Sequence, residues 1–210
     1  MFKGRNFLLL AATAIFTVGC QTKPVANSGS FQKAKWESIA QINDLKKNRN
    51  QRLSIDILAI KNEKMRMEVS ATLGYQVASI LLNREGFKAV IYPQKKIYQG
   101  AAHERAIWQT LHVPVTPKAL FAVMFDEPIS GNNWVCEKNQ NGLPELCVQR
   151  QMQIKVEWVR NENGTKVVKI SSPNVDISWY FKNPEINFLE KPEMFILNAP
   201  QGYQTVSANR

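Results

Sequence analysis

The sequence is poor in the residues that most catalytic and metal sites use. Only two histidines, His103 and His112, and three cysteines occur among 210 residues. The histidines are nine positions apart, which does not place two ligands on one face of a helix, so each is better explained as a surface residue. The chain also lacks a Gly-x-Ser-x-Gly elbow, a phosphate-binding glycine loop and zinc-ligand spacing. We therefore expect no catalytic residues, no metal and no diffusible cofactor.

Long apolar runs are also scarce, and the only marked one lies near the N-terminus. Lys3 and Arg5 precede the uncharged run Phe7–Val18. This run is too short to cross a hydrocarbon core of roughly 30 Å as a helix, but its length is typical of a signal peptide. It ends in Thr17-Val18-Gly19-Cys20, which resembles the lipobox of bacterial lipoproteins.

The lipobox resemblance implies cleavage before Cys20 and covalent attachment of lipid to that cysteine, whose acyl chains would hold the protein at a membrane. Residues 1–19 would then form a signal peptide, residues 20–30 a lipidated N-terminus and tether, and residues 31–210 one folded domain. In many such proteins an Asp after the cysteine causes retention in the inner membrane. Gln21 stands there in this chain, which implies the periplasmic face of the outer membrane. The alternative is an ordinary secretory signal with a chance cysteine.

The charge balance is basic, with a formal net charge of +10. Removal of Lys3 and Arg5 with the signal peptide would leave 25 basic and 17 acidic residues. An exported, lipidated protein rarely meets nucleic acid, and the aromatic residues are spread along predicted strands rather than grouped with arginine. The cations are scattered and favour a solubilising role, with attraction to anionic lipid head groups as the alternative.

Two cysteines remain beside Cys20, and their positions predict a disulfide. Cys136 and Cys147 flank Asn141-Gly142, which is a strong hairpin-turn signal. The two cysteines could therefore face each other across paired strands, and an oxidising periplasm favours the bond. Their spacing is typical of neither a redox motif nor a zinc site.

Hydrophobic periodicity predicts a mainly β domain with a few helices. Apolar residues near helical spacing predict an amphipathic helix over Phe31–Lys47, and short helices are predicted at Ala101–Leu111 and Thr116–Phe125, the latter capped by Thr116. Alternation with a period of two predicts strands at Leu53–Ala59, Met65–Ala71, Tyr75–Leu82, Phe87–Tyr92, Lys95–Gln99, Asn133–Glu137, Leu146–Arg150, Gln151–Arg160, Thr165–Ser172, Val175–Phe181 and Met194–Leu197. This number of strands favours a strongly curved antiparallel sheet or an open barrel, with the middle helices covering one mouth.

The order of several short motifs resembles the LolA/LolB family of lipoprotein carriers. The residues that carry the resemblance to the outer-membrane receptor LolB are Arg66–Gly74, Ser79–Asn83, Gly86, Tyr98–Gly100, Leu111, Pro114, Leu120 and Pro128. The end of the chain, Phe195–Gly202, is more similar to the soluble periplasmic carrier LolA. The family has a further strand before the region that corresponds to Leu53–Asn62, which the pattern does not place here. The cysteine hairpin is also not part of the family pattern.

The resemblance implies an incomplete antiparallel β-barrel of about 10–11 strands with a short-helix lid, to which the pattern adds the N-terminal helix. The implied function is non-enzymatic. A monomer at the outer membrane would accept lipidated cargo proteins from a periplasmic LolA-like carrier and help insert them into outer-membrane lipid. Leu73, before Gly74, corresponds to an exposed leucine on a loop that promotes membrane insertion in LolB. The resemblance also implies an apolar cavity for acyl chains, and alternation selects its candidate lining: Met65, Met67, Val69, Leu81, Ile91, Leu120, Met124, Val156, Trp158, Ile177 and Trp179.

Three alternatives remain at the level of sequence. One is a general lipid-binding lipoprotein of the same fold, and another is an enzyme whose site is assembled from distant residues. The third is a structural or sensing envelope lipoprotein that docks a partner protein, with a filled interior and a surface patch in place of a cavity. The methionines could then simply fill a core, and Leu73 could be a turn residue tucked beneath the sheet.

Overall fold

The computed structural model describes residues 31–207 apart from residues 85, 102–114, 132 and 187. The expected signal peptide (1–19), Cys20 and the tether (20–30) lie outside the described residues, as does nearly all of the helix expected at Ala101–Leu111, including His103. His112 lies outside them as well.

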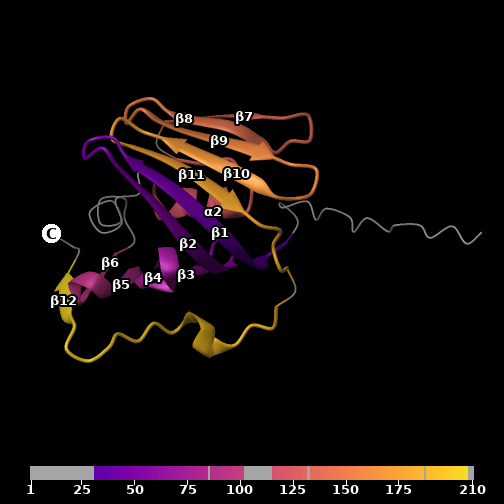
Figure 1. The fold of residues 1–210 in the computed structure, drawn as a ribbon. Coiled ribbons are helices and arrows are strands. Elements are labelled where there is room, and N and C mark those ends of the chain that lie inside the picture. The colour runs from indigo at the N-terminus through magenta and orange to yellow at the C-terminus, as the bar shows by residue number, and fades with distance from the viewer. Residues whose placement is uncertain (1–30, 85, 102–114, 132, 187, 208–210) are drawn as a thin grey trace, which may run out of the picture.

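The described residues form one twelve-stranded sheet that does not close into a barrel (Figure 1). The strand order is β12-β6-β5-β4-β3-β2-β1-β11-β10-β9-β8-β7, so β12 and β7 are the two edges. Neighbouring strands are antiparallel, except that β12 runs parallel to β6. The strands are β1 (Lys33–Asp44), β2 (Arg49–Ile60), β3 (Lys64–Ala71), β4 (Gln76–Asn83), β5 (Phe87–Ile91), β6 (Lys96–Gly100), β7 (Trp134–Lys138), β8 (Pro144–Gln149), β9 (Ile154–Arg160), β10 (Lys166–Ser171), β11 (Val175–Phe181) and β12 (Gln204–Ser207).

The curved sheet encloses α2 (Pro117–Met124) on its concave side (Figure 1). Thr116 caps this helix as predicted, because its Oγ1 accepts a hydrogen bond of 3.0 Å from the Ala119 amide. All residues from Ala119 to Met124 are buried. A helix that is apolar on every side can only be stable inside a core, and the core here is built by α2 with the inward side chains of β1–β5 and β8–β11.

The helix expected over Phe31–Lys47 is wrong, because the chain forms β1 there. Ala34, Trp36 and Ala40 are buried on the inward face, which is the alternation of a strand. Ser38 interrupts this pattern as a buried polar residue. Its hydroxyl donates to the Ile55 carbonyl oxygen at 2.7 Å and accepts from the Trp179 indole at 2.9 Å. Because a polar residue occupies an inward position, the period of two was hidden. β1 supplies the strand that the resemblance required before β2.

The strand expected at Met194–Leu197 is also wrong. The chain forms the short 3-10 turn η3 (Pro192–Phe195) at this point and then continues without regular structure. The last strand is β12 instead, a four-residue edge strand with few apolar residues. β12 is short and pairs in parallel with β6, so its sequence shows no alternation of apolar and polar residues that would predict a strand.

The C-terminal segment between β11 and β12, residues 182–186 and 188–203, crosses the convex face of the sheet as a strap (Figure 1). Arg66 donates hydrogen bonds to the carbonyl oxygens of Met194 at 3.1 Å and Ile196 at 2.8 Å. Lys88 donates to the Leu197 carbonyl oxygen at 2.9 Å. Outward side chains of β3 and β5 thereby hold the strap against the sheet.

Candidate apolar cavity and its surroundings

An apolar cavity of about 330 Å³ lies on the concave face of the sheet. It is bounded by β1–β5, β11 and α2, whose inward side chains point into it. Its apolar lining excludes hydrogen-bonding partners and suits hydrocarbon. This lining consists of Ala40, Ile42, Leu53, Ile55, Met67, Val69, Val77, Ala78, Ile80, Ile91, Leu120, Val175, Ile177 and Trp179.

The polar residues that line the cavity all come from one end of the strands. They are Asp44, Lys47, Arg49, Gln51 and Gln94. The first four belong to the hairpin between β1 and β2, and Gln94 belongs to η2 (Tyr92–Gln94), between β5 and β6. The cavity therefore opens at this end of the sheet. The mouth end is defined here as the β1–β2 hairpin (residues 44–52), η1 (Thr72–Gly74) with the following Tyr75, and the turn from η2 to the start of β6 (residues 92–96).

Six of the eleven residues predicted to line a cavity do so: Met67, Val69, Ile91, Leu120, Ile177 and Trp179. Another four are buried in the same core outside the cavity: Met65, Met124, Val156 and Trp158. Leu81 lies on the opposite face and packs with Val90, Ile97 and Leu197 beneath the strap. Both faces of β4 are covered, and Ile80, the residue before Leu81, points into the cavity. Alternation alone therefore could not show whether Ile80 or Leu81 lines it.

The cavity lining predicted from the sequence omitted the residues of β1 and of the first half of β2. Ala40 and Ile42 line the cavity from β1, and Leu53 and Ile55 line it from β2. The β1 residues were missed because that segment had been interpreted as a helix. The signal that could have found them is the same-parity series Ala34, Trp36, Ala40 and Ile42.

Leu73 protrudes from the mouth end. It lies in η1 and is 89% exposed, and the next tyrosine, Tyr75, is 72% exposed. The Ala71 amide donates to the Tyr75 carbonyl oxygen at 2.8 Å, which closes the loop behind Leu73. Leu73 adopts a positive φ of 69°, which L-residues with a branched side chain rarely do, and Gly74 follows at 79°. The loop therefore presents a leucine to solvent on a strained backbone rather than tucking it beneath the sheet.

The end of α2 is fastened at the end of the strands opposite the mouth. The Lys166 ammonium group, at the start of β10, donates to the carbonyl oxygens of Val123 and Met124, both at 2.8 Å, and to Asp126 Oδ1 at 3.0 Å. Arg160, at the end of β9, also reaches Asp126 at 3.2 Å. Burial lowers the pKa of Lys166, and the Asp126 carboxylate opposes that shift. These contacts hold α2 in a fixed position at the floor of the cavity.

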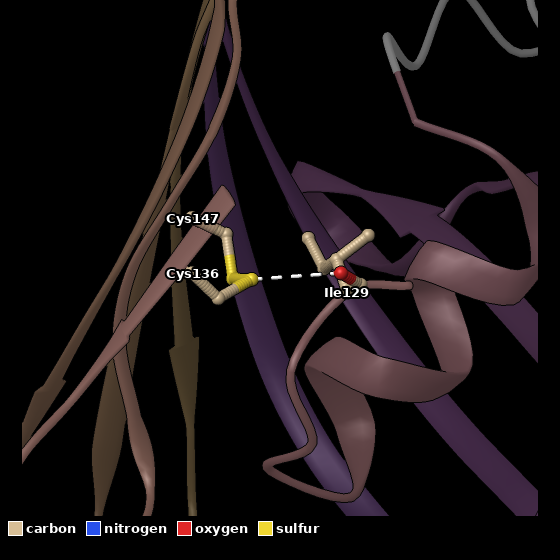
Figure 2. The surroundings of a disulfide bond; sticks show 3 residues. All are labelled: Ile129, Cys136 and Cys147. Atoms are coloured by element: carbon tan, nitrogen blue, oxygen red, sulfur yellow. Dashed lines mark hydrogen bonds between the residues drawn. A yellow bond between two sulfur atoms is a disulfide. The ribbon is translucent and has the colours of Figure 1, made fainter. Parts of the chain in front are cut away.

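A disulfide joins Cys136 and Cys147, as predicted (Figure 2). The two residues are direct partners in the antiparallel pairing of β7 and β8, with Cα atoms 4.1 Å apart. Gly142 has a φ of 75° in the connecting turn, which explains the glycine there. Cys136 Sγ lies 3.5 Å from the Ile129 carbonyl oxygen, a packing contact because a disulfide sulfur has no proton to donate. The disulfide thus joins the edge strand β7 to β8, and Cys136 contacts the loop that follows α2.

A larger cleft of about 940 Å³ lies on the convex face under the strap. Charged side chains line it, among them Glu37, Asp56, Arg66, Glu68 and Lys182. An acyl chain would be poorly accommodated there, because it would displace water from these charged groups. The smaller concave cavity is therefore the better candidate for an apolar ligand.

Within the described residues, no group of three or more His, Cys, Asp or Glu side chains is placed to hold a metal ion. In the same part of the chain, no helix is long and apolar enough to cross a membrane.

The fold and the cavity define a class of protein: a curved, open antiparallel sheet that holds a helix and an apolar cavity on its concave side. No family model matches the chain, and no curated sequence matches it. Solved structures do. A domain from Vibrio parahaemolyticus named for outer membrane lipoprotein sorting superposes with a TM-score of 0.53, at 5% identity, over 78% of this chain and 88% of that one.

A DUF1329 family protein from Desulfovibrio piger superposes with a TM-score of 0.51, at 7% identity, over 80% of this chain and 91% of that one. At such identities the likeness shows the fold alone. The curved, open sheet of this chain is therefore similar in fold to that lipoprotein-sorting domain and to the DUF1329 protein, which is the kind of fold that the sequence resemblance implied.

Proposed function

We propose that this protein is a non-enzymatic acceptor of acyl chains that handles lipidated proteins at the periplasmic face of the outer membrane, in the manner of LolB. The observation that carries the proposal is the apolar cavity of about 330 Å³, which opens beside the exposed Leu73. A carrier of hydrocarbon needs an apolar pocket and an exit to a bilayer, and it needs no catalytic groups.

The cavity is suited to chains of variable shape. Met67 lies in its wall, and thioether side chains repack easily around different ligands. Leu120 of α2 forms its floor, so a ligand would contact the helix as well as the sheet. The acyl chains of a cargo lipoprotein are the proposed ligand, and no cofactor beyond the covalent lipid on Cys20 is required.

The remaining parts of the proposal concern location and partners. Lipid on Cys20 would anchor the chain through the tether of residues 20–30. A soluble LolA-like carrier would deliver the cargo, and the protein would act as a monomer. Leu73 would dip into the bilayer and lower the barrier to release.

The first experiment uses the chain from Gln21 onward, which retains every described strand and the whole described core. Native mass spectrometry with lipid extraction should find a co-purifying acylated ligand that a fatty-acid probe displaces. A clean apo mass with no probe binding would contradict the proposal. The alternative of a partner-docking envelope protein with a packed interior would then be preferred.

A further inference from the structure

The β1–β2 hairpin is strongly basic, and the cavity does not require this charge. Residues 45–52 read Leu-Lys-Lys-Asn-Arg-Asn-Gln-Arg, with four cations and no anion. All four cationic side chains are exposed. Among the described residues, Lys47 is the only one of the four with an ion-pair partner, which is Asp44 at 3.8 Å. The hairpin therefore presents positive charge that the described part of the chain does not neutralise.

A second basic turn lies at the same end of the sheet. Lys95 and Lys96 follow η2, and neither forms an ion pair with a described residue. Gln94 of this turn lines the cavity mouth together with Lys47 and Arg49 of the hairpin, so the two basic turns flank one opening. The mouth end as a whole is a positively charged rim.

Apolar side chains are exposed on the same rim. Leu45 at the hairpin is 45% exposed, and Leu73 and Tyr75 on the neighbouring loop are 89% and 72% exposed. They lie at the same end of the sheet, because β2 pairs Leu53 with Ala71, the residue just before η1, and the β1–β2 hairpin projects beyond that pair. Cations beside exposed leucine and tyrosine are typical of surfaces that enter the head-group region of a bilayer. An acidic protein surface would complement the cations but would leave these apolar side chains in water.

We propose that the mouth end is a docking surface for an anionic lipid bilayer. Lys46 and Arg52 contact the lipid phosphates, while Leu45 and Tyr75 enter the interface between head groups and acyl chains. In this orientation the cavity faces the bilayer. The proposal deepens the proposed function, in which Leu73 enters the bilayer, because it names the lipid class that the mouth end recognises; the docking itself does not depend on what the cavity holds.

Vesicle co-sedimentation tests the docking surface, again with the chain from Gln21 so that no lipid anchor contributes. One set of vesicles is pure phosphatidylcholine and the other contains about 30 mol% phosphatidylglycerol, whose phosphates give the surface a negative potential. We expect binding to the second set only, weakened by added salt. Equal binding to both sets, or binding to neither, would overturn the proposal. Absence of vesicle binding would favour an acidic protein partner instead.

The double variant Lys46→Glu with Arg52→Glu tests the hairpin. Both residues are exposed and neither lines the cavity. The matched control is Lys118→Glu with Lys138→Glu, which changes the net charge equally at exposed positions away from the mouth end. Each cation near an anionic surface contributes about fivefold in affinity, so the hairpin variant should bind anionic vesicles at least about tenfold more weakly. Equal losses in both variants would overturn the assignment to the hairpin.

A fluorescent fatty-acid probe, measured on the same samples, separates this proposal from the proposed function. The hairpin variant should keep its affinity for the probe. Probe binding without vesicle binding would overturn the docking surface and leave the carrier function standing. Vesicle binding without probe binding would support the docking surface and contradict the carrier function. Circular dichroism of each variant confirms that the sheet is intact.

Discussion

The Lys166 ammonium nitrogen lies 3.0 Å from Asp126 Oδ1, and the two side chains are 7% and 1% exposed. Because the same nitrogen also donates to the last carbonyl groups of α2, a single cation satisfies the helix end and the carboxylate that follows it. This pair connects α2 to the sheet.

Replacement of Lys166 by Met should lower the free energy of unfolding by about 3 kcal/mol. The substitution keeps the apolar stem but leaves Asp126 with Arg160 as its remaining ionic partner and the α2 carbonyls without their donor. Urea denaturation followed by circular dichroism measures the change. Lys118→Met, at the exposed start of α2, is the control and should change stability by less than about 0.5 kcal/mol. Equal effects would show that the buried contacts contribute nothing specific.

The pH dependence of stability should differ between the wild type and Lys166→Met. Burial lowers the folded-state pKa of Lys166 below its ordinary 10.5. The unfolded chain therefore binds more protons than the folded chain between the folded-state pKa and 10.5, so stability contributed by this residue rises with pH in that window. The gap in unfolding free energy between the two proteins should widen as pH approaches 10.5. A gap that narrows would contradict the direction of the pKa shift.

Ala40→Leu should weaken binding of a fatty-acid probe by about tenfold. Ala40 is 2% exposed in the cavity wall, so added carbon atoms would occupy ligand space and contact the opposite wall. The control is Ala199→Leu, which adds the same carbons beneath the strap on the convex face. Fluorescence titration measures both affinities. Unchanged affinity in Ala40→Leu would place the ligand outside this cavity.

Leu73→Glu should leave stability unchanged and slow the transfer of a bound acylated probe to lipid vesicles. The side chain is almost wholly exposed, so its replacement removes no core contact. A charged group would have to be desolvated to enter the bilayer. Leu189→Glu, at another exposed leucine on the strap, is the matched control and should transfer normally. Normal transfer by Leu73→Glu would remove this residue from the mechanism.

The double variant Cys136→Ala with Cys147→Ala should lower the free energy of unfolding by about 2–3 kcal/mol. The disulfide closes a short loop and restricts the unfolded chain. Urea denaturation of the wild type with and without reductant gives an independent measure, and the reduced wild type should match the variant. If neither the variant nor the reduced wild type is less stable than the oxidised wild type, strand pairing alone holds the β7 edge in place.

Ten of the twelve strands could be predicted from the sequence because their alternation is regular. Met65, Met67 and Val69 in β3 illustrate this, since each is buried and each polar neighbour is less so. β1 was not predicted, because Ser38 interrupts its alternation at an inward position, where a hydrogen bond to β2 and another from β11 satisfy the hydroxyl group. Ile55 and Trp179, the hydrogen-bond partners of Ser38, lie far from it in the sequence, so local periodicity contains no information about them.

The cavity could be predicted only in part for a related reason. Alternation tells which face of a strand is buried, but it does not distinguish a packed position from one that borders empty space. Met65 and Met67 share a face of β3, yet only Met67 reaches the cavity. The basic mouth end was also not foreseen, because scattered cations become a rim only when turns from distant strands meet at one end.

The order of the strands divides the sheet into two meanders, β1–β6 and β7–β11, which meet at the single antiparallel pairing of β1 with β11. Each meander contains only local pairings, whereas Ile42 and Ile177 at the junction are far apart in the sequence. Closing so long a loop is entropically costly and slows folding. During synthesis the first meander can form early, but its outer strand β1 must wait for residues 175–181. Joining of the two halves should therefore limit the rate of folding, and until it occurs both β1 and β11 remain open edges that could pair with another chain.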